Sequence, residues 1–282
     1  MTVPFLKMNG LGNDFVVLDT RGGGHAPTPA VIQKLANRRF GIGFDQLIVI
    51  EPGRPGADIY MRIFNPDGSE AGACGNATRC VGRMVFEETG KGEAVVETVA
   101  GKLRVWPAAD SLVTADMGAP RLKWDEIPLA REMDTRTLDL TVGPEDEPVL
   151  SKPGAVNMGN PHCVFFVRRA PTKDIESFGP LIENHALFPE KTNVGFAEVQ
   201  GRHAIRLRMW ERGTGVTLAC GSGACAAVVA AHRRGLTDRA VDVELDGGTL
   251  HIDWREDTNH VHMTGPADLN YEGTLDLSHF EG

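Results

Sequence analysis

The chain has 282 residues, of which 41% are hydrophobic, so it can bury a sizeable core and is slightly long for one average domain. Its net charge of −9 argues against a nucleic-acid-binding or anionic-membrane surface, because both need clustered Lys and Arg. Five cysteines are an odd number, which does not suit a disulfide framework, and the N-terminal residues form no apolar run of signal-peptide type. We therefore expect free thiols, a cytoplasmic protein, and no nucleic-acid or membrane partner.

The chain contains an internal repeat. Alternating apolar residues from Asp58 onward predict a half-buried strand, which leads through a glycine-bearing loop to an Ala-Cys-Gly sequence at 73–75. Residues 204–221 align with 58–75 at a shift of 146 residues and end in the same three letters. Further matches join 29–44 with 180–196, the strands ending at Trp106 with those ending at Trp254, and 117–120 with 263–266.

A helix is predicted after the cysteine in each half. The first runs from 76 to 89 with Gly90 as its stop, and the second runs from 223 to 234 with Gly235 as its stop. Both helices carry small or apolar residues over much of their surface. We therefore expect each helix to be central and surrounded by the strands of its own half.

These patterns predict an α+β fold made of two pseudo-symmetric halves. Each half is expected to be a barrel-like, mostly antiparallel sheet wrapped around its central helix, with the active site in the cleft between the halves. The first predicted domain comprises residues 1–120 together with 266–282, which return to it. The second comprises residues 121–265.

Cys74 and Cys220 occupy the same place in the repeat, each just before a helix. A helix N-terminus can lower the pKa of a thiol from about 8.5 to between roughly 3.5 and 7.5, so we expect each cysteine to form a thiolate at modest cost. If the halves face each other, one thiolate can remove a Cα proton while the other thiol returns one to the opposite face. The pattern thus predicts a two-thiol racemase or epimerase. The other cysteines, Cys80, Cys163 and Cys225, are predicted to be small buried side chains.

Five strings occur in the order MNGLGNDFVVLD, FNPDGSEAGACGNATRC, GNPHCVFF, TNVGF and WERGTGVTLACGSGACA, between about Asn9 and Ala226. Together they resemble the motifs of the diaminopimelate epimerase family. The resemblance implies an isomerase that converts LL-diaminopimelate to meso-diaminopimelate for lysine and peptidoglycan precursor biosynthesis. It also implies a homodimer that uses neither pyridoxal phosphate nor metal, so no cofactor is expected.

The same resemblance implies the roles of individual residues. Cys74 and Cys220 would be the acid/base pair, and His162 and Glu211 would tune the thiols. The implied substrate-binding residues are Asn13, Gln46, Asn65, Gly75, Asn76, Asn160, Asn193, Arg212, Gly221 and Ser222. These types suit a substrate with two ammonium and two carboxylate groups, because Asn and Gln both donate and accept, and Arg can bind the distal carboxylate through two bonds. Gln46 rests on the resemblance alone.

Two positions depart from the family pattern, because Gly195 and Val216 stand where Glu is expected. Three alternatives remain open. A proline-racemase-like or hydroxyproline epimerase shares the two-thiol logic but does not need a distal clamp such as Arg212. A phenazine-biosynthesis type of isomerase lacks the paired cysteines. A non-catalytic amino-acid-binding protein would keep Asn and Arg but would not need two thiols at helix starts.

Overall fold

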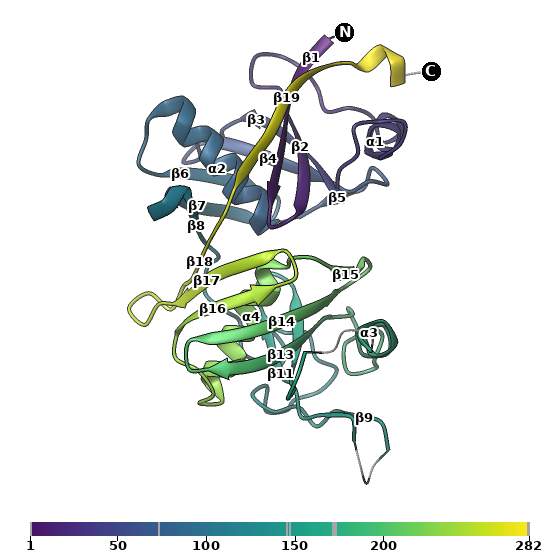
Figure 1. The fold of residues 1–282 in the computed structure, drawn as a ribbon, viewed down its shortest axis with the longest axis vertical. Coiled ribbons are helices and arrows are strands. Elements are labelled where there is room, and N and C mark those ends of the chain that lie inside the picture. Colours follow the sequence, from purple (N-terminus) through teal and green to yellow (C-terminus); the bar gives the residue numbers. More distant parts are fainter. Residues whose placement is uncertain (1, 73, 145, 147, 171–173, 281–282) are drawn as a thin grey trace. The chain divides into compact units, whose positions relative to one another are not determined.

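The computed structural model describes residues 2–72, 74–144, 146, 148–170 and 174–280 (Figure 1). The chain forms two compact units. Unit 1 comprises Met1–Ala115 and Thr264–Gly282, and unit 2 comprises Asp116–Met263. The chain therefore passes between the units at residues 115/116 and 263/264. The boundaries predicted from the sequence are 120/121 and 265/266.

The described part of unit 1 contains two α-helices and a set of paired strands. Strand β1 pairs with β2 and β19, both antiparallel, and β2 is parallel to β3. Strand β4 is antiparallel to β3 and β5 and parallel to β6. The elements are β1 (Thr2–Gly10), β2 (Asn13–Asp19), α1 (Pro29–Ala36), β3 (Gln46–Pro52), β4 (Ile59–Phe64), β5 (Glu70–Ala71), α2 (Gly75–Thr89), β6 (Ala94–Thr98), β7 (Gly101–Pro107), η1 (Ala109–Ser111), β8 (Val113–Asp116), β19 (Asp268–Asp276) and η2 (Leu277–Phe280).

Unit 2 repeats this order of pairing. Strand β12 is antiparallel to β11 and parallel to β13, and β14 is antiparallel to β13 and β15 and parallel to β16. The elements are β9 (Thr141–Val142), β10 (Leu150–Ser151), β11 (Gly154–Asn157), β12 (Pro161–Phe166), α3 (Ile175–Glu183), β13 (Asn193–Gly201), β14 (Ala204–Glu211), β15 (Gly215–Thr217), α4 (Gly221–Arg233), β16 (Ala240–Leu245), β17 (Gly248–Trp254) and β18 (Val261–Gly265). The described chain is thus a mixed α/β fold with a large sheet and four α-helices.

The structure corrects one part of the sequence alignment. Pro29 is the first residue of α1, but Pro180, with which the sequence aligns it, lies inside α3. Strand register gives the true equivalences. Because β3 begins at Gln46 beside β2 and β13 begins at Asn193 beside β12, Gln46 corresponds to Asn193.

The two helices that follow the cysteines are deeply buried. In α4, residues 223–231 are all buried, and the helix contacts β11, β12, β13, β14, β16 and β17. Glycine and alanine at most of these positions let strands approach closely. Helix α2 contacts β1, β6 and β7, and it ends at Gly90 in the left-handed conformation with φ +67°. The helices begin at Gly75 and Gly221, one and two residues before their predicted starts.

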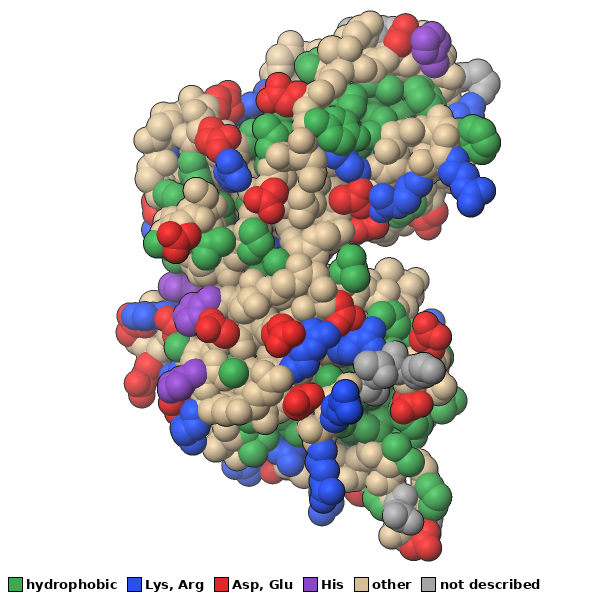
Figure 2. Space-filling view, in the orientation of Figure 1, with side chains coloured by type: hydrophobic (Ala, Val, Ile, Leu, Met, Phe, Trp, Pro, Cys, Tyr) green, Lys and Arg blue, Asp and Glu red, His purple; other side chains and the backbone are tan. Residues whose placement is uncertain are grey.

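Charged side chains of both signs are interspersed on the face drawn in Figure 2. On β14, Arg206 and Arg208 both form ion pairs with Asp246, whose side chain is 23% exposed. Each such pair neutralises charge locally. Among the residues that the structure describes, none of the helices has the length and apolar character needed to cross a membrane.

Candidate active site

In unit 1, the predicted site residues gather at the start of α2. Cys74 is the N-cap residue, and its Sγ lies 3.7 Å from Oδ1 of Asn13. The same oxygen accepts a 3.3 Å hydrogen bond from Nδ2 of Asn76, whose own oxygen accepts a 2.9 Å bond from the fully buried Arg79. Asn13 also donates to Asp45. Cys74 therefore lies among amides that are themselves fixed by charged partners.

Gln46 and Asn65 form a second polar pair in unit 1. Gln46 Nε2 donates to Oδ1 of Asn65 at 3.3 Å, and Asn65 Nδ2 donates to Oγ of Ser69 at 3.1 Å. Gln46 Oε1 is buried, and none of the described residues gives it a hydrogen bond. A buried acceptor without a partner costs free energy, so this oxygen is suited to accept a bond from an ammonium group of a ligand.

In unit 2, Cys220 is the N-cap residue of α4 and is only 4% exposed. Its Sγ lies 3.7 Å from Oγ of Ser222. Burial raises the pKa of the Cys220 thiol well above its usual value, and the charge of Glu211 and a hydrogen bond with it raise this pKa further. The backbone N–H of Gly223 and the hydroxyl of Ser222 oppose that rise. The expectation of a lowered pKa is therefore wrong for Cys220, because loss of hydration outweighs the helix N-terminus.

Glu211 and His162 also have defined partners in unit 2. Thr217 donates a hydrogen bond to Oε1 of Glu211 at 2.5 Å. His162 is fully buried, and its Nε2 lies 2.8 Å from Oδ1 of Asn160. Burial, with the positive charge of Arg212, lowers the pKa of His162 to about 3. The imidazole is therefore neutral at physiological pH. Because Oδ1 of Asn160 can only accept, the proton is assigned to Nε2, and the buried Nδ1 has no hydrogen-bond partner among the described residues.

The side chain of Asn193 fixes the backbone around Arg212. Its Oδ1 accepts a 3.0 Å bond from the Arg212 N–H, and its Nδ2 donates to the carbonyl of Pro161. The Arg212 guanidinium donates to the carbonyl of Glu190 at 2.8 Å. Arg212 and Asn160 line a cavity of about 370 Å³ together with Arg121, Asp125, Glu126, Pro128, Asn157, Gly159, Pro161 and Glu190. This cavity in unit 2 is polar and large enough for the end of an amino-acid substrate.

Strand register shows a relation between site residues that the sequence alone does not. His162 pairs with Asn193 across β12 and β13, and Glu211 follows Trp210, which pairs with Val194 across β13 and β14. In unit 1, Phe15 pairs with Gln46, and Asn65, which follows Phe64 of β4, accepts a hydrogen bond from Gln46. Gln46 has no local signal in the sequence, but an alignment made from strand register instead of from prolines would have found it. Asn13 corresponds in the same way to Asn160.

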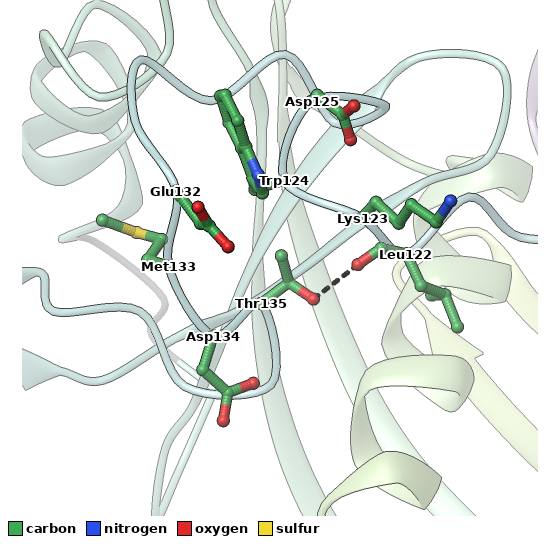
Figure 3. A pocket seen from close by; sticks show the side chains of 8 residues that line it. All are labelled: Leu122, Lys123, Trp124, Asp125, Glu132, Met133, Asp134 and Thr135. Carbon is green, nitrogen blue, oxygen red and sulfur yellow. Dashed lines mark hydrogen bonds between the residues drawn. The ribbon is translucent and has the colours of Figure 1, made fainter.

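A second cavity in unit 2, of about 610 Å³, contains none of the predicted site residues. Figure 3 shows its lining, Leu122–Asp125 and Glu132–Thr135, with the hydroxyl of Thr135 donating to the carbonyl of Leu122 at 2.7 Å. It shares only Asp125 with the smaller cavity. The smaller cavity, which contains Arg212 and Asn160, is therefore the one relevant to the predicted chemistry.

The fold is that of the proline racemases and related isomerases. A probable proline racemase from Agrobacterium radiobacter superposes with a TM-score of 0.69 at 17% identity, over 99% of this chain and 94% of that chain. A hydroxyproline epimerase from Agrobacterium vitis gives a TM-score of 0.67 at 15% identity, over 97% and 91%. A phenazine biosynthesis protein of the PhzF family from Bacillus anthracis gives 0.66 at 16%, over 98% and 99%. At these identities the likeness shows the fold alone.

The family model of diaminopimelate epimerase matches residues 5–123 and 154–270. The diaminopimelate epimerase of Phenylobacterium zucineum is 55% identical over 272 residues, covering 96% of this chain and 97% of that protein. That of Caulobacter vibrioides is 53% identical over 282 residues, covering 98% of each. The chain therefore belongs to the diaminopimelate epimerase family and is an isomerase of lysine biosynthesis, which confirms the resemblance found in the sequence.

Proposed function

We propose that this chain epimerises LL-diaminopimelate to meso-diaminopimelate by proton transfer between Cα and two cysteines, Cys74 and Cys220. The product also serves as a peptidoglycan precursor. One observation carries the mechanism: the two units repeat the same strand pairing, and each places one cysteine at the N-cap of its buried helix. A reaction that removes a proton from one face of a carbon and returns one to the other face needs such a matched pair.

The proton balance uses one thiolate and one thiol. A thiolate takes the Cα proton, and the electrons of the broken C–H bond spread into the adjacent carboxylate. The other thiol donates its proton to the opposite face of the same carbon and becomes the new thiolate. The reverse reaction exchanges the two roles, so neither cofactor nor metal is required by this scheme.

The free N–H groups at the starts of α2 and α4 suit the reacting carboxylate. Gly75 and Asn76 begin α2, and Gly221 and Ser222 begin α4. The first N–H groups of a helix have no partner within the helix and lie at its positive end. Their interaction with the carboxylate strengthens as negative charge moves into it, which lowers the barrier to proton removal.

Glu211 and His162 are proposed to set the protonation of the thiols. The carboxylate of Glu211 favours a protonated Cys220, which is the form needed for a proton donor. His162 is neutral and presents a lone pair on Nδ1, so it can accept a hydrogen bond but cannot act as a cation. Both residues therefore provide hydrogen-bond acceptors, and not donors of positive charge, in unit 2, which contains Cys220.

The distal end of the substrate is assigned to Arg212 and the amides near it. Arg212 lines the 370 Å³ cavity with Asn160, and a guanidinium can bind a carboxylate through two parallel bonds. Gln46, with its unpartnered oxygen, and Asn65 are assigned to ammonium groups. A substrate with a ring and a single carboxylate has no distal carboxylate for Arg212 to bind, which favours diaminopimelate over proline. A homodimer is part of the proposal.

The decisive experiment follows hydrogen at Cα in heavy water. LL-diaminopimelate is incubated with the protein, and the meso product is examined by NMR and mass spectrometry. The two-cysteine mechanism predicts one solvent deuterium at the inverted carbon of each product molecule. The double variant Cys74→Ala with Cys220→Ala serves as the control and should incorporate none. Inverted product that keeps the substrate hydrogen would contradict the mechanism, and an amino-acid-binding protein would produce neither inversion nor exchange.

A further inference from the structure

One methionine in unit 2 lies wedged between two glycines and beside Cys220. Met209 is 2% exposed and stands on β14 opposite Gly195 of β13. A Cβ atom built on Gly195 would lie 3.2 Å from the Met209 Sδ, and one built on Gly223 of α4 would lie 2.6 Å from the Met209 Cε. Both contacts are closer than side chains normally tolerate. The absence of a side chain on both glycines is therefore what gives the Met209 side chain its space.

The same three places in unit 1 are filled differently. Ile48 pairs with Ile63 across β3 and β4, as Gly195 pairs with Met209 across β13 and β14. Ala77, the third residue after Cys74, corresponds to Gly223, the third residue after Cys220. Ile48, Ile63 and Ala77 are all fully buried. Unit 1 thus has two isoleucines and an alanine at these positions, whereas unit 2 has a methionine and two glycines.

Met209 touches the part of α4 that stabilises the Cys220 thiolate. The Cβ position on Gly223 that lies 2.6 Å from the Met209 Cε lies only 3.1 Å from the Cys220 Sγ. The backbone N–H of Gly223 is also hydrogen-bonded to Cys220. The thioether, this N–H and the thiol therefore share one small space in the first turn of α4. A shift of Met209 would move the donor relative to the sulfur.

We propose that Met209 is a positioning residue that holds the first turn of α4 and the Cys220 thiol in the geometry required for proton transfer. The proposal rests on the proposed role of Cys220. It also explains Gly195, which stands where the family pattern leads one to expect Glu. A long side chain there would need the space that Met209 occupies.

The test measures the reactivity of Cys220 directly, without diaminopimelate. The rate of modification by methyl methanethiosulfonate is followed against pH, and peptide mapping gives separate values for Cys220 and Cys74. In Met209→Ala the midpoint for Cys220 should move to higher pH, because the loosened Gly223 N–H stabilises the thiolate less and an apolar cavity of this kind stays dry. The midpoint for Cys74 should not move. Met209→Leu, which keeps the volume, should restore the wild-type midpoint.

The matched control is Ile63→Ala, which removes a buried side chain at the equivalent place in unit 1. It should leave the Cys220 midpoint at the wild-type value. If both variants shift the midpoint equally, or if Met209→Ala leaves it unchanged or lowers it, Met209 does not position Cys220. Should Met209→Ala fail to fold, Gly195→Ala replaces it, because its new methyl group presses on the Met209 Sδ from the other side and should also shift the Cys220 midpoint alone.

Steady-state kinetics give a second readout. For Met209→Ala we expect kcat to fall by about 10- to 100-fold with KM changed by less than about threefold, since misplacing a reacting group by an ångström costs on the order of 100-fold in rate. Loss that lies mainly in KM would contradict the proposal. If Cys220→Ala retains full activity, the proposed function fails instead, and that result is independent of the modification midpoints.

Discussion

At the scale of single residues, the proposed chemistry depends on two thiols that are not interchangeable with the other three. We expect Cys74→Ala and Cys220→Ala each to lower kcat for LL-diaminopimelate by at least about 100-fold, because a positioned acid or base contributes roughly 10²–10⁴-fold. Each helix supplies its own control. Cys80 in α2 and Cys225 in α4 are fully buried away from the N-cap, and their alanine variants should stay active. A cysteine variant at position 74 or 220 with more than about a tenth of wild-type activity would contradict the mechanism.

Arg212 should govern substrate selection. Arg212 lines the 370 Å³ cavity, and its backbone N–H is held by Asn193. A hydrogen bond to a charged group contributes about 1.5–3 kcal/mol, so Arg212→Ala should lose about 10- to 150-fold in kcat/KM for diaminopimelate. Lysine lacks the distal carboxylate and should be a poor substrate for the wild type. Both substrates are assayed with both proteins, and the assignment fails if the preference for diaminopimelate is the same in each.

The charge of Glu211 gives a prediction with a definite sign. Burial and the Glu211 carboxylate both raise the pKa of Cys220, which keeps the thiol protonated to higher pH. Glu211→Gln removes the charge and keeps the size, so the pH midpoint for modification of Cys220 should move to lower pH. The turnover rate should fall at the same time, since the proton donor is less protonated. A midpoint that stays fixed or rises would show that the carboxylate does not act on this thiol.

The sequence leads to a set of proposed site residues, but it does not predict the environment of each one. Cys74 and Cys220 could be found because a repeat places both beside helix starts. The raised pKa of Cys220 could not, because it depends on burial by strands that are distant in the sequence. Gln46 is a similar case: its equivalence to Asn193 appears only when the strands are paired.

At the scale of elements, helix ends were easier to predict than helix beginnings. Gly90 was predicted as a stop, and it adopts the left-handed conformation that glycine tolerates best. The starts at Gly75 and Gly221 carry no side-chain cap hydrogen bond, so they give no local signal. The prolines at positions 29 and 180 do not occupy equivalent places in α1 and α3. Proline usually marks the first turn, as Pro29 does in α1, but Pro180 lies inside α3.

The end of α2 provides a test of backbone conformation without any change in packing. A Cβ atom on Gly90 would meet nothing within 4 Å, so Gly90→Ala has only the cost of the left-handed conformation, about 1–2 kcal/mol. Gly92 is equally open but has no positive φ, and Gly92→Ala is the matched control. We expect a lower urea midpoint for Gly90→Ala and no loss for Gly92→Ala. Equal effects would show that the cost does not come from φ.

At the scale of the whole molecule, the two units share one order of strand pairing but differ in the side chains at equivalent positions. The order of strand pairing is the same in both units, yet unit 2 has His162 and Glu211 where unit 1 has Phe15 and Asn65. In unit 2 the carboxylate of Glu211 acts on the Cys220 thiol, whereas in unit 1 the Sγ of Cys74 lies beside the amide oxygen of Asn13. This is consistent with a reaction whose two faces are related by symmetry but whose substrates, the LL and meso isomers, are not.

Each unit contains one of the two proposed catalytic thiols. A disulfide between Cys74 and Cys220 would therefore support the proposal that both thiols act on the same carbon atom. Mild treatment with hydrogen peroxide should oxidise Cys74, which is half-buried, to the sulfenic acid, and the Cys220 thiol should then displace water to form a disulfide. Peptide mapping should find Cys74 joined to Cys220, and reduction should restore activity. The other three cysteines are buried away from Cys74: burial raises the pKa of Cys80 to about 12 and also raises that of Cys163, and Cys225 lies inside α4 and not at its N-cap. A disulfide that includes one of these three, or Cys74 sulfenic acid that forms without any Cys74–Cys220 link, would show that the two thiols do not approach each other.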